Sequence, residues 1–588
     1  GRTSGDGLPD GFAWGTGTTD SVNTWGIKIG NDVSFSSSNG AIFMAGHGTS
    51  AGAGNTSDGI SAGPGLRVDS GSQKIGLYGT SNAASTGEWS RGIVFYGASA
   101  ARNTQIVSSN SSADSIVVIG DASATLAANS SGIQSYRGTG NTTNTIIANT
   151  GTGGIQMTGR GAAVAPAGIT DTVGDGLEFN GVGVLAKSGA IVLTGTTAGA
   201  NNSILYGLSL NHTTSTTYGA APNWIGAAAS ATTINSQSMT SSSSPITLNV
   251  DSMLFTGATG GTSYAQNIST TGAITIQPAD SAASFDRAIS TAGMTLVSGA
   301  ASMTIGQSGT SGTVSGATQN SADVTLAIAM TVAGPISVYG GTITSNASQI
   351  TTVAGAAVLL KATQDIVLGN GTNSTTTNSL VANGNGAVTL WSNADASGSG
   401  AIQVGDYTRL TSSGGAITLA GGSTATESSP TGSAINNGST YATGVLIGIT
   451  SQSSNSVISS GGGSVLIKGY SNNNGAWSNG VTVTRGSNLN SGTGTITITG
   501  TSDGNTNATG SAGVQISSGS GDFASLIDST NTTSSAISIT GTNTGGTGTS
   551  QYGTYLSSDV ATIAQVRATG TGGFTSITGT TTASGTSY

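Results

Sequence analysis

The sequence of 588 residues contains no cysteine. This absence excludes a disulfide framework, a zinc–thiolate site, an iron–sulfur cluster and a thiol nucleophile. Two histidines are present, His47 and His212, and they lie too far apart in sequence for a local metal motif. Only 7% of the residues are charged and 5% are aromatic, against roughly 25% charged residues in an ordinary globular domain. The composition therefore does not indicate an enzyme.

Positive charge and long apolar runs are also scarce. Fifteen Lys and Arg residues stand against 24 Asp and Glu residues, which gives a net charge of −9 and argues against nucleic acid as a partner. No run of about 18 apolar residues occurs, so the sequence predicts no membrane-spanning helix. No secretory signal opens the chain. It begins at Gly1 and closes on the phrase GTSY part-way through a repeat, which indicates a segment of a longer array.

Glycine, small hydroxyl residues and β-branched residues make up most of the chain. There are 96 glycines and 8 prolines, yet 35% of the residues are hydrophobic. A disordered linker has low hydrophobicity, whereas the apolar residues here come in short, patterned runs. The sequence therefore predicts a folded, repetitive β protein.

One short phrase recurs along the chain: a small residue, then apolar–polar–apolar, then often glycine. It occurs at 272–276, 386–390, 415–419, 463–467, 494–498 and 535–539. Such alternation predicts short strands with one buried face. Anchors at positions 445, 465, 481, 496, 514 and 537 lie 15 to 23 residues apart, and a period of this kind is typical of stacked repeats.

The pattern predicts an all-β fold, an elongated right-handed parallel β-helix (β-solenoid). We expect a coil of roughly 20 residues with about three strands, and about 28 coils if the whole chain is solenoid, giving a rod of roughly 130 Å. Right-handed winding follows from the handedness of parallel crossovers. Pro245, Pro278 and Pro335 are expected at strand boundaries. Residues 1–170 repeat less cleanly and predict an irregular β-rich section or cap, and residues 171–588 predict the regular repeats.

Several of these phrases resemble a bacterial family. The stretches GAVTLWSNAD (386–395), GGAITLAGG (414–422), TITITG (495–500) and YGTYL (552–556) are similar to the repeat region of filamentous-haemagglutinin-like exoproteins and giant adhesins. The resemblance covers about residues 170–588. It implies a secreted right-handed parallel β-helix, displayed as a fibre and used in adhesion or biofilm structure. The family's amino-terminal secretion domain is not recognisable here, and the resemblance implies no catalytic residue.

A phosphate-binding loop is one alternative reading of a glycine-rich stretch. Residues 181–188 read GVGVLAKS, with Ala186 where the motif has its second glycine. A phosphate cradle needs a helix after the loop, whereas residues 189–193, GAIVL, predict a strand. The sequence favours a strand that ends in a solvated Lys187.

Acidic residues give no compact catalytic or metal motif. A single Gly519-Ser520-Gly521-Asp522-Phe523 turn and the Gly-Asp-Gly turns at 5–7 and 174–176 lack the stacked copies that a calcium repeat needs, so surface calcium remains only an open alternative. Glycoside cleavage needs paired carboxylates, but the glutamates stand alone. Their positions are Glu88, Glu178 and Glu427, and the aspartates that neighbouring coils could bring together are Asp365, Asp395 and Asp406.

Threonines and aromatic residues suggest two kinds of surface recognition. The alternating threonines of 495–499 resemble those of ice-binding solenoids, although irregular coil lengths argue against a long flat ladder. Aromatic rings stack on sugars or neighbouring chains, and the candidates are Tyr78, Tyr96, Tyr136, Trp224, Trp391 and Trp477.

The sequence thus favours a secreted, non-enzymatic structural or adhesive β-solenoid at the bacterial cell surface or in a biofilm matrix. It predicts no catalytic, cofactor-binding or metal-binding residues. The expected partners are further copies of the chain, joined head-to-tail or laterally, with cell-surface glycans as a further candidate. A carbohydrate-binding or polysaccharide-cleaving β-helix is the alternative, and an ice-binding or calcium-dependent surface-layer protein is the third class.

Overall fold

The computed structural model divides into two compact units, residues 1–301 and residues 302–588. Each unit is described by itself. The described residues are 13–14, 24–38, 40–49, 57–81, 89–97, 102–125, 130–136, 145–162, 174–198, 205–210, 222–228, 232–255, 258–259, 262–263, 266–297, 299–309, 319–353, 355–369, 378–395, 397–422, 433–436, 443–448, 456–472, 477–503, 510–518, 523–533, 535–545, 549–558 and 563–582.

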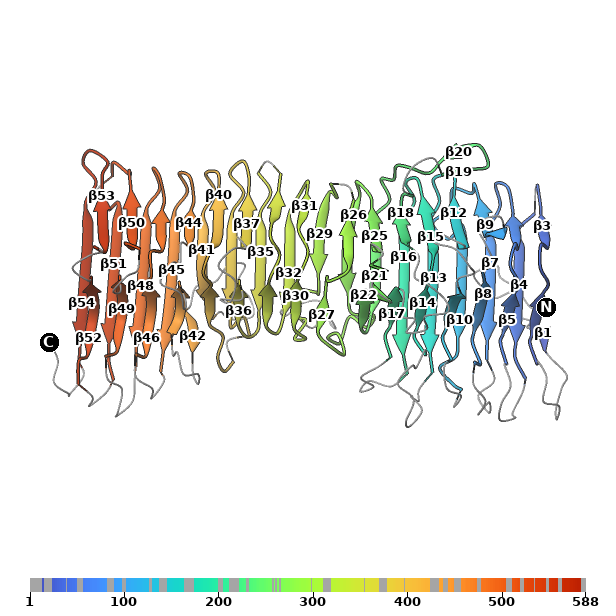
Figure 1. Cartoon of the computed structure of the whole chain (residues 1–588), viewed down its shortest axis with the longest axis horizontal. Coiled ribbons are helices and arrows are strands. Elements are labelled where there is room, and N and C mark those ends of the chain that lie inside the picture. Colours follow the sequence, from blue (N-terminus) through green and yellow to red (C-terminus); the bar gives the residue numbers. More distant parts are fainter. Residues whose placement is uncertain are drawn as a thin grey trace. The chain divides into compact units, whose positions relative to one another are not determined.

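Three parallel sheets build the first unit, and the chain visits them in turn (Figure 1). Sheet 1a contains β1 (Ala13–Trp14), β4 (Ile42–His47), β7 (Ile75–Thr80), β10 (Ile116–Asp121), β13 (Ile155–Gly161), β16 (Ile191–Thr197), β21 (Ile246–Val250) and β26 (Ala273–Gln277). Sheet 2a contains β2 (Ile27–Ile29), β5 (Ile60–Ala62), β8 (Ile93–Tyr96), β11 (Ile133–Tyr136), β14 (Leu177–Phe179), β17 (Leu208–Leu210) and β22 (Met253–Phe255). Sheet 3a contains β3 (Ser34–Ser36), β6 (Arg67–Asp69), β9 (Thr104–Ser108), β12 (Thr145–Asn149), β15 (Val182–Ala186), β18 (Asn223–Gly226), β25 (Gln266–Ser269) and β28 (Met294–Leu296).

Two antiparallel hairpins and one short strand complete the first unit. The hairpins are β19 (Thr233–Ile234) with β20 (Gln237–Ser238) and β23 (Ala258–Thr259) with β24 (Thr262–Ser263), and the short strand is β27 (Ile289–Ser290).

The second unit repeats the three-sheet plan. Sheet 1b contains β29 (Ser302–Ile305), β32 (Ile336–Gly340), β35 (Val358–Ala362), β38 (Val388–Ser392), β41 (Ile417–Gly421), β42 (Ala434–Asn436), β45 (Val465–Ser471), β48 (Ile496–Ser502), β51 (Ile537–Asn543) and β54 (Thr575–Thr581). Sheet 2b contains β30 (Val324–Leu326), β33 (Ile343–Ser345), β36 (Ile366–Leu368), β39 (Ile402–Val404), β43 (Thr443–Ile447), β46 (Asn479–Val483), β49 (Ala512–Ser517) and β52 (Tyr552–Ser557). Sheet 3b contains β31 (Met330–Val332), β34 (Ile350–Thr352), β37 (Asn378–Ala382), β40 (Thr408–Ser412), β44 (Val457–Ser459), β47 (Asn488–Asn490), β50 (Leu526–Ser529) and β53 (Gln565–Ala568).

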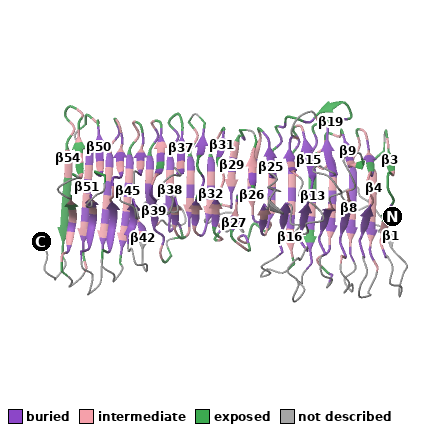
Figure 2. Ribbon diagram, in the orientation of Figure 1, coloured by how far each residue is buried: buried purple, intermediate pink, exposed green. Residues whose placement is uncertain are grey.

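The predicted all-β parallel β-helix is therefore confirmed. The described residues contain no α-helix, and none of their elements is a helix long and apolar enough to cross a membrane. Successive coils pair in register, so equivalent apolar residues stack in columns. One column of sheet 1a consists of Ile42, Ile75, Ile116, Ile155, Ile191, Ile246 and Ile274. Figure 2 shows the resulting alternation of buried and partly exposed positions along the strands.

The expected coil of about 20 residues is wrong. A single step between stacked residues can be close to the expected length, such as the 22 positions from Ile336 to Val358, but other steps are far longer, such as the 48 positions from Ile417 to Val465. In the first unit, 55 positions separate Ile191 from the residue stacked on it. The error has a simple cause: the anchors at 445, 481 and 514 belong to sheet 2b, and those at 465, 496 and 537 belong to sheet 1b. Their spacing measures two strands of one coil rather than two coils, so the units contain fewer, longer coils than expected.

Glycine columns bring sheets 1 and 2 into backbone contact. In sheet 1a, Gly120 pairs with Gly79 on one side and Gly159 on the other. A Cβ at Gly120 would lie 2.0 Å from the carbonyl oxygen of Gly132, which precedes β11. In the second unit, a Cβ at Gly500 would likewise lie 2.0 Å from the carbonyl oxygen of Gly513 in β49. Only glycine fits at such distances, so these columns close one side of the apolar core.

The predicted positions of three prolines can be compared with the strands. Pro245 and Pro335 directly precede β21 and β32, and Pro278 directly follows β26, as predicted for residues that cannot donate to a ladder. The boundary expected at residue 170 lies outside the described residues. The three-strand order continues on both sides of it, because β13 pairs with β16 over seven positions.

Candidate functional site

A hairpin arm covers the outer face of sheet 3a. The arm comprises residues 232–239, contains β19 and β20, and lies between β18 and β21 along the chain (Figure 1). Its Ile234 and Met239 side chains are buried in a second apolar cluster. The cluster also contains Val107, Ile146, Ala148 and Leu185, with Trp224 and Ala228 packed against it. These sheet residues alternate with core positions such as Ile147 and Val184, so they face away from the main core.

Hydrogen bonds hold both ends of the arm. Asn235 and Ser236 form its turn with positive φ angles of 46° and 61°, which suits a two-residue hairpin. The Asn235 side chain donates to Asp69 of β6 at 2.9 Å. At the base, the Ala228 N–H donates to the Met239 carbonyl at 2.8 Å. The arm is therefore attached along its length rather than projecting freely.

A hollow of about 630 Å³ lies beside the arm. The described residues that line it are Lys187, Gln237, Ser238, Thr240, Ser241, Ser242, Ser243, Ser269 and Thr271. Lys187 follows β15, and its ammonium donates to Gln237 Oε1 of the arm at 2.5 Å. The Ser243 N–H donates to the Lys187 carbonyl at 2.8 Å, and the Thr271 N–H donates to the Ser242 carbonyl at 2.8 Å. Three consecutive coils thus contribute to one polar concavity, and Lys187 is the cationic side chain among its described lining residues.

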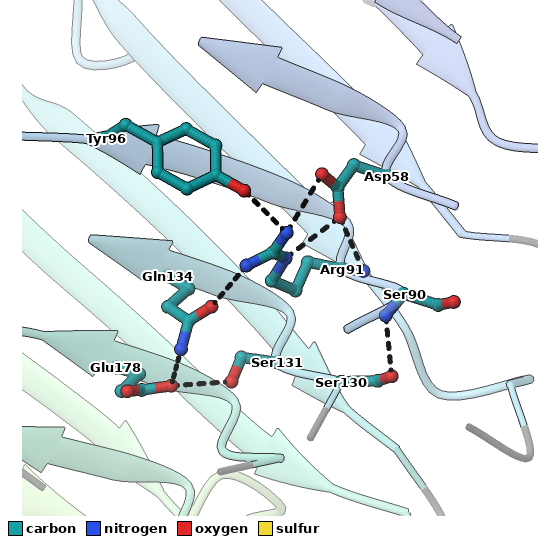
Figure 3. A network of polar contacts seen from close by, with 8 residues as sticks. All are labelled: Asp58, Ser90, Arg91, Tyr96, Ser130, Ser131, Gln134 and Glu178. Carbon is teal, nitrogen blue, oxygen red and sulfur yellow. Dashed lines mark hydrogen bonds and ion pairs between the residues drawn. The ribbon is translucent and has the colours of Figure 1, made fainter. Parts of the chain in front are cut away.

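A buried polar network lies on sheet 2a (Figure 3). Arg91 is 1% exposed, and its guanidinium donates to both carboxylate oxygens of Asp58, at 2.8 and 3.1 Å. It also donates to Gln134 Oε1 at 3.0 Å and to the Tyr96 hydroxyl at 2.9 Å. Gln134 in turn donates to Glu178 at 2.7 Å. The network therefore joins four successive coils.

Three aromatic rings surround the Arg91 guanidinium. Its central carbon lies 5.8, 5.6 and 5.4 Å from the ring centroids of Trp89, Tyr96 and Tyr136. Burial alone would lower the pKa of Arg91, but attraction to Asp58 outweighs it and the pKa is raised. Burial also raises the pKa of the Tyr136 hydroxyl. The raised pKa keeps the Arg91 guanidinium charged, and its burial leaves it covered by the residues of the network.

Asp251, in the first unit, is a carboxylate whose pKa is strongly raised. Burial and the nearby charge of Asp286 raise its pKa to about 6, against the opposing effect of the Thr197 N–H, which donates to it at 3.2 Å. Asp286 also has a raised pKa because of burial. The Arg287 guanidinium lies 5.2 Å from the ring centroid of Tyr206. This carboxylate pair was not singled out in the sequence, because 35 positions separate its members.

The glycine-rich stretch at 181–188 is not a phosphate loop. Residues Val182–Ala186 form β15, which is paired in parallel on both sides with β12 and β18, and β16 follows it. The helix that a phosphate cradle requires is replaced by a strand. Lys187 directly follows that strand, as predicted, but its side chain is half-buried in the lining of the hollow beside the arm rather than solvated.

The predicted carboxylates occupy separate positions. Asp365 accepts the Ala401 N–H at 2.7 Å and Asp395 accepts the Ser397 N–H at 3.1 Å, while Asp406 is buried. Glu178 belongs to the Arg91 network. Glu88, Glu427, His212, the turn at 5–7 and Asp522 lie outside the described residues. Within the described part of the chain, no group of three or more His, Asp or Glu residues could hold a metal ion.

Outward threonines form a regular array on three strands of sheet 1b. The array consists of Thr497, Thr499, Thr501, Ser538, Thr540, Thr542, Ser576, Thr578 and Thr580, which stack in register. It ends at β45, where Leu466, Lys468 and Tyr470 take the equivalent positions. The array spans only three of the described strands, which agrees with the expectation that no long threonine ladder forms.

The predicted aromatic platforms differ in exposure. Trp391 is buried, and Lys361 lies 4.3 Å from its ring centroid. Trp224 packs under the arm, and Tyr96 and Tyr136 stack on each other at 5.4 Å. Trp477 is 54% exposed. Sequence reasoning missed the arm itself, and the signal that could have indicated it is the long stretch between β18 and β21.

Comparison with protein-family models, with curated proteins and with solved structures finds no match to this chain.

Proposed function

We propose that this chain is a secreted structural or adhesive β-solenoid, which forms or decorates extracellular fibres at a bacterial cell surface or in a biofilm matrix. In this role the protein catalyses no reaction. Three of the carboxylates singled out in the sequence support this, because Asp365 and Asp395 accept backbone N–H groups and Glu178 is buried in the Arg91 network. The resemblance of the repeats to filamentous-haemagglutinin-like adhesins points the same way.

The strand edge of β54 carries the proposal. β54 pairs with β51 over seven positions in the register that β51 uses with β48. Among the described residues, β51 is the strand whose register with β54 is defined, and β7 pairs with β4 and β10. Ile577 is 41% exposed, whereas Ile539, its partner in β51, is fully buried. This edge has the pattern of an internal coil and can pair with a further strand, either from the next coil of a longer chain or from a second copy.

A second copy of the chain fits this edge, because its own coils carry the same apolar and glycine spacing. Phe574, just before β54, and Leu556 of β52 are further exposed apolar side chains. Covering these side chains would remove apolar area from water, which is the main driving force for association. We therefore expect head-to-tail contact between copies, and lateral packing of the weakly charged flanks would thicken the fibre.

The test is the oligomeric state. Sedimentation velocity over a concentration series, together with cryo-electron microscopy, should show assemblies with an axial repeat of about 4.8 Å. Ile577→Lys should reduce assembly, because the added charge would lie at the pairing edge. Val353→Lys is the matched control, since it places the same charge on another exposed apolar residue of the second unit. A chain that stays monomeric at every concentration would contradict the fibre.

A further inference from the structure

We propose that the hollow beside the arm binds an acidic saccharide, a sugar whose ring bears a carboxylate, and that Lys187 pairs with that carboxylate. This inference goes beyond the proposed function, because occupancy of the hollow requires no assembly of copies. A soluble monomer would bind the same ligand.

The size of the hollow fits a short saccharide. Its volume of about 630 Å³ lies within the range of roughly 300–1,000 Å³ that small-molecule sites occupy. An inorganic anion alone would leave most of this space filled with water. A sugar of one to a few rings would use it more fully.

The lining is built from hydrogen-bonding groups. Ser238 and Thr240 hydroxyl oxygens lie 3.0 Å apart, and Gln237 presents an amide beside them. Each hydroxyl both donates and accepts, which matches the hydroxyl groups of a sugar. The described residues of the lining include no aromatic side chain, so recognition by them would depend on hydrogen bonds and charge rather than on ring stacking.

The charge of the hollow selects an anion. Lys187 is the one charged residue among the described residues that line it, in a chain of net charge −9. The Lys187 ammonium has three donors, and its hydrogen bond within the described structure goes to Gln237 Oε1. Two donors therefore remain for a carboxylate. Gln237 holds the ammonium in the lining of the hollow without neutralising it.

The hollow is held in shape before a ligand arrives. Ile234 and Met239 anchor the arm in its own apolar cluster, and Asn235 ties the turn of the arm to Asp69. The Ser243 N–H fixes the backbone of Lys187. A preformed site of this kind avoids the entropy cost of ordering its walls on binding.

Titration calorimetry and NMR with a galacturonate trisaccharide test the proposal, with a neutral galactose trisaccharide and inorganic phosphate as comparison probes. The acidic trisaccharide should bind saturably and more weakly as salt rises, because a charge pair at the surface is screened. The neutral trisaccharide and phosphate should each bind at least about tenfold more weakly, since each lacks one of the two matching features.

Variants locate the site. Lys187→Gln should weaken acidic-trisaccharide binding by about tenfold or more, while Lys28→Gln, which removes the same charge elsewhere in the first unit, should leave it unchanged. Ile234→Asp should release the arm and abolish binding although Lys187 remains. Equal binding of the neutral sugar, unchanged binding by Lys187→Gln in a protein that melts normally, or no binding of the acidic trisaccharide would each overturn the proposal.

Discussion

The backbones of Gly120 and Gly132 touch: a Cβ at Gly120 would lie 2.0 Å from the carbonyl oxygen of Gly132. Gly120→Ala must therefore push sheets 1a and 2a apart. Overpacking of a dense core costs about 1–3 kcal/mol, and backbone that cannot yield places this substitution at the upper end. We therefore expect urea unfolding to show a loss of about 3 kcal/mol in the free energy of unfolding of the first unit. Gly30→Ala is the control, because a Cβ at Gly30 would meet nothing within 4 Å, and equal losses in the two variants would refute the contact.

Arg91 and Asp58 form a buried ion pair whose partners depend on each other. Arg91→Met leaves the Asp58 carboxylate buried without its cation, and we expect a loss of about 3–5 kcal/mol in the free energy of unfolding. The double variant Arg91→Met/Asp58→Leu should recover part of that loss. A double-mutant cycle measured by urea unfolding tests the coupling.

The exposed pair of Lys74 and Asp114 provides the control for the buried one. Its Nζ–Oδ2 distance is 2.5 Å, but both side chains are more than a third exposed. Lys74→Met should cost at most about 1 kcal/mol. If Arg91→Met cost no more than Lys74→Met, the buried network would not stabilise the fold as proposed.

The strands were predictable because each carries its own local signal. Ile496-Thr497-Ile498 and Ile537-Ser538-Ile539 alternate as half-buried strands must, and both are strands whose isoleucines are buried. The coil length was not predictable, because strands of sheets 1b and 2b have the same pattern. Val465 and Val481 look like successive repeats in sequence, yet they belong to different sheets of one coil.

The candidate site was not predictable because it depends on register between coils. Ile234 of the arm packs with Val107, more than 120 positions earlier, and no periodicity links them. Arg91 and Asp58 are 33 positions apart, in coils whose lengths vary. The sequence drew attention to Lys187 through a phosphate-loop motif that the structure does not contain. The placement of the arm, which brings Gln237 to Lys187, is what makes this lysine part of a hollow.

The arm packs on the outside of sheet 3a and should detach without unfolding the solenoid. Ile234→Asp places a charge in the second apolar cluster, while the main core residues Ile147 and Val184 are untouched. We expect rapid proteolysis confined to the arm, residues 232–239, and a melting temperature close to that of the parent. Val353→Asp, at an exposed site, is the control. A large fall in melting temperature would instead show that the arm belongs to the cooperative core.

The raised pKa of Asp251 predicts that the first unit loses stability between about pH 4 and pH 7. The pKa of its carboxyl is about 6 in the folded chain because of burial and of Asp286, against roughly 3.9 in an unfolded chain. The folded state therefore binds the proton more tightly. Its contribution to stability is complete below about pH 4 and is lost as pH rises through 6. The full shift corresponds to about 3 kcal/mol, and solvent access to the carboxylate reduces the expected change to about 1–2 kcal/mol.

Asp251→Asn isolates this effect from the other titrating groups. The asparagine is neutral at every pH and still offers an oxygen to the Thr197 N–H. Urea unfolding of parent and variant at pH 4, 5, 6 and 7 should show the variant gaining on the parent as pH rises. Asp395→Asn, which removes a carboxylate from an exposed turn of the second unit, provides the matched control. A constant difference between Asp251→Asn and the parent from pH 4 to 7 would mean that the Asp251 carboxyl does not carry the proton in the folded chain, because only a group that titrates differently in the two states can make the difference depend on pH.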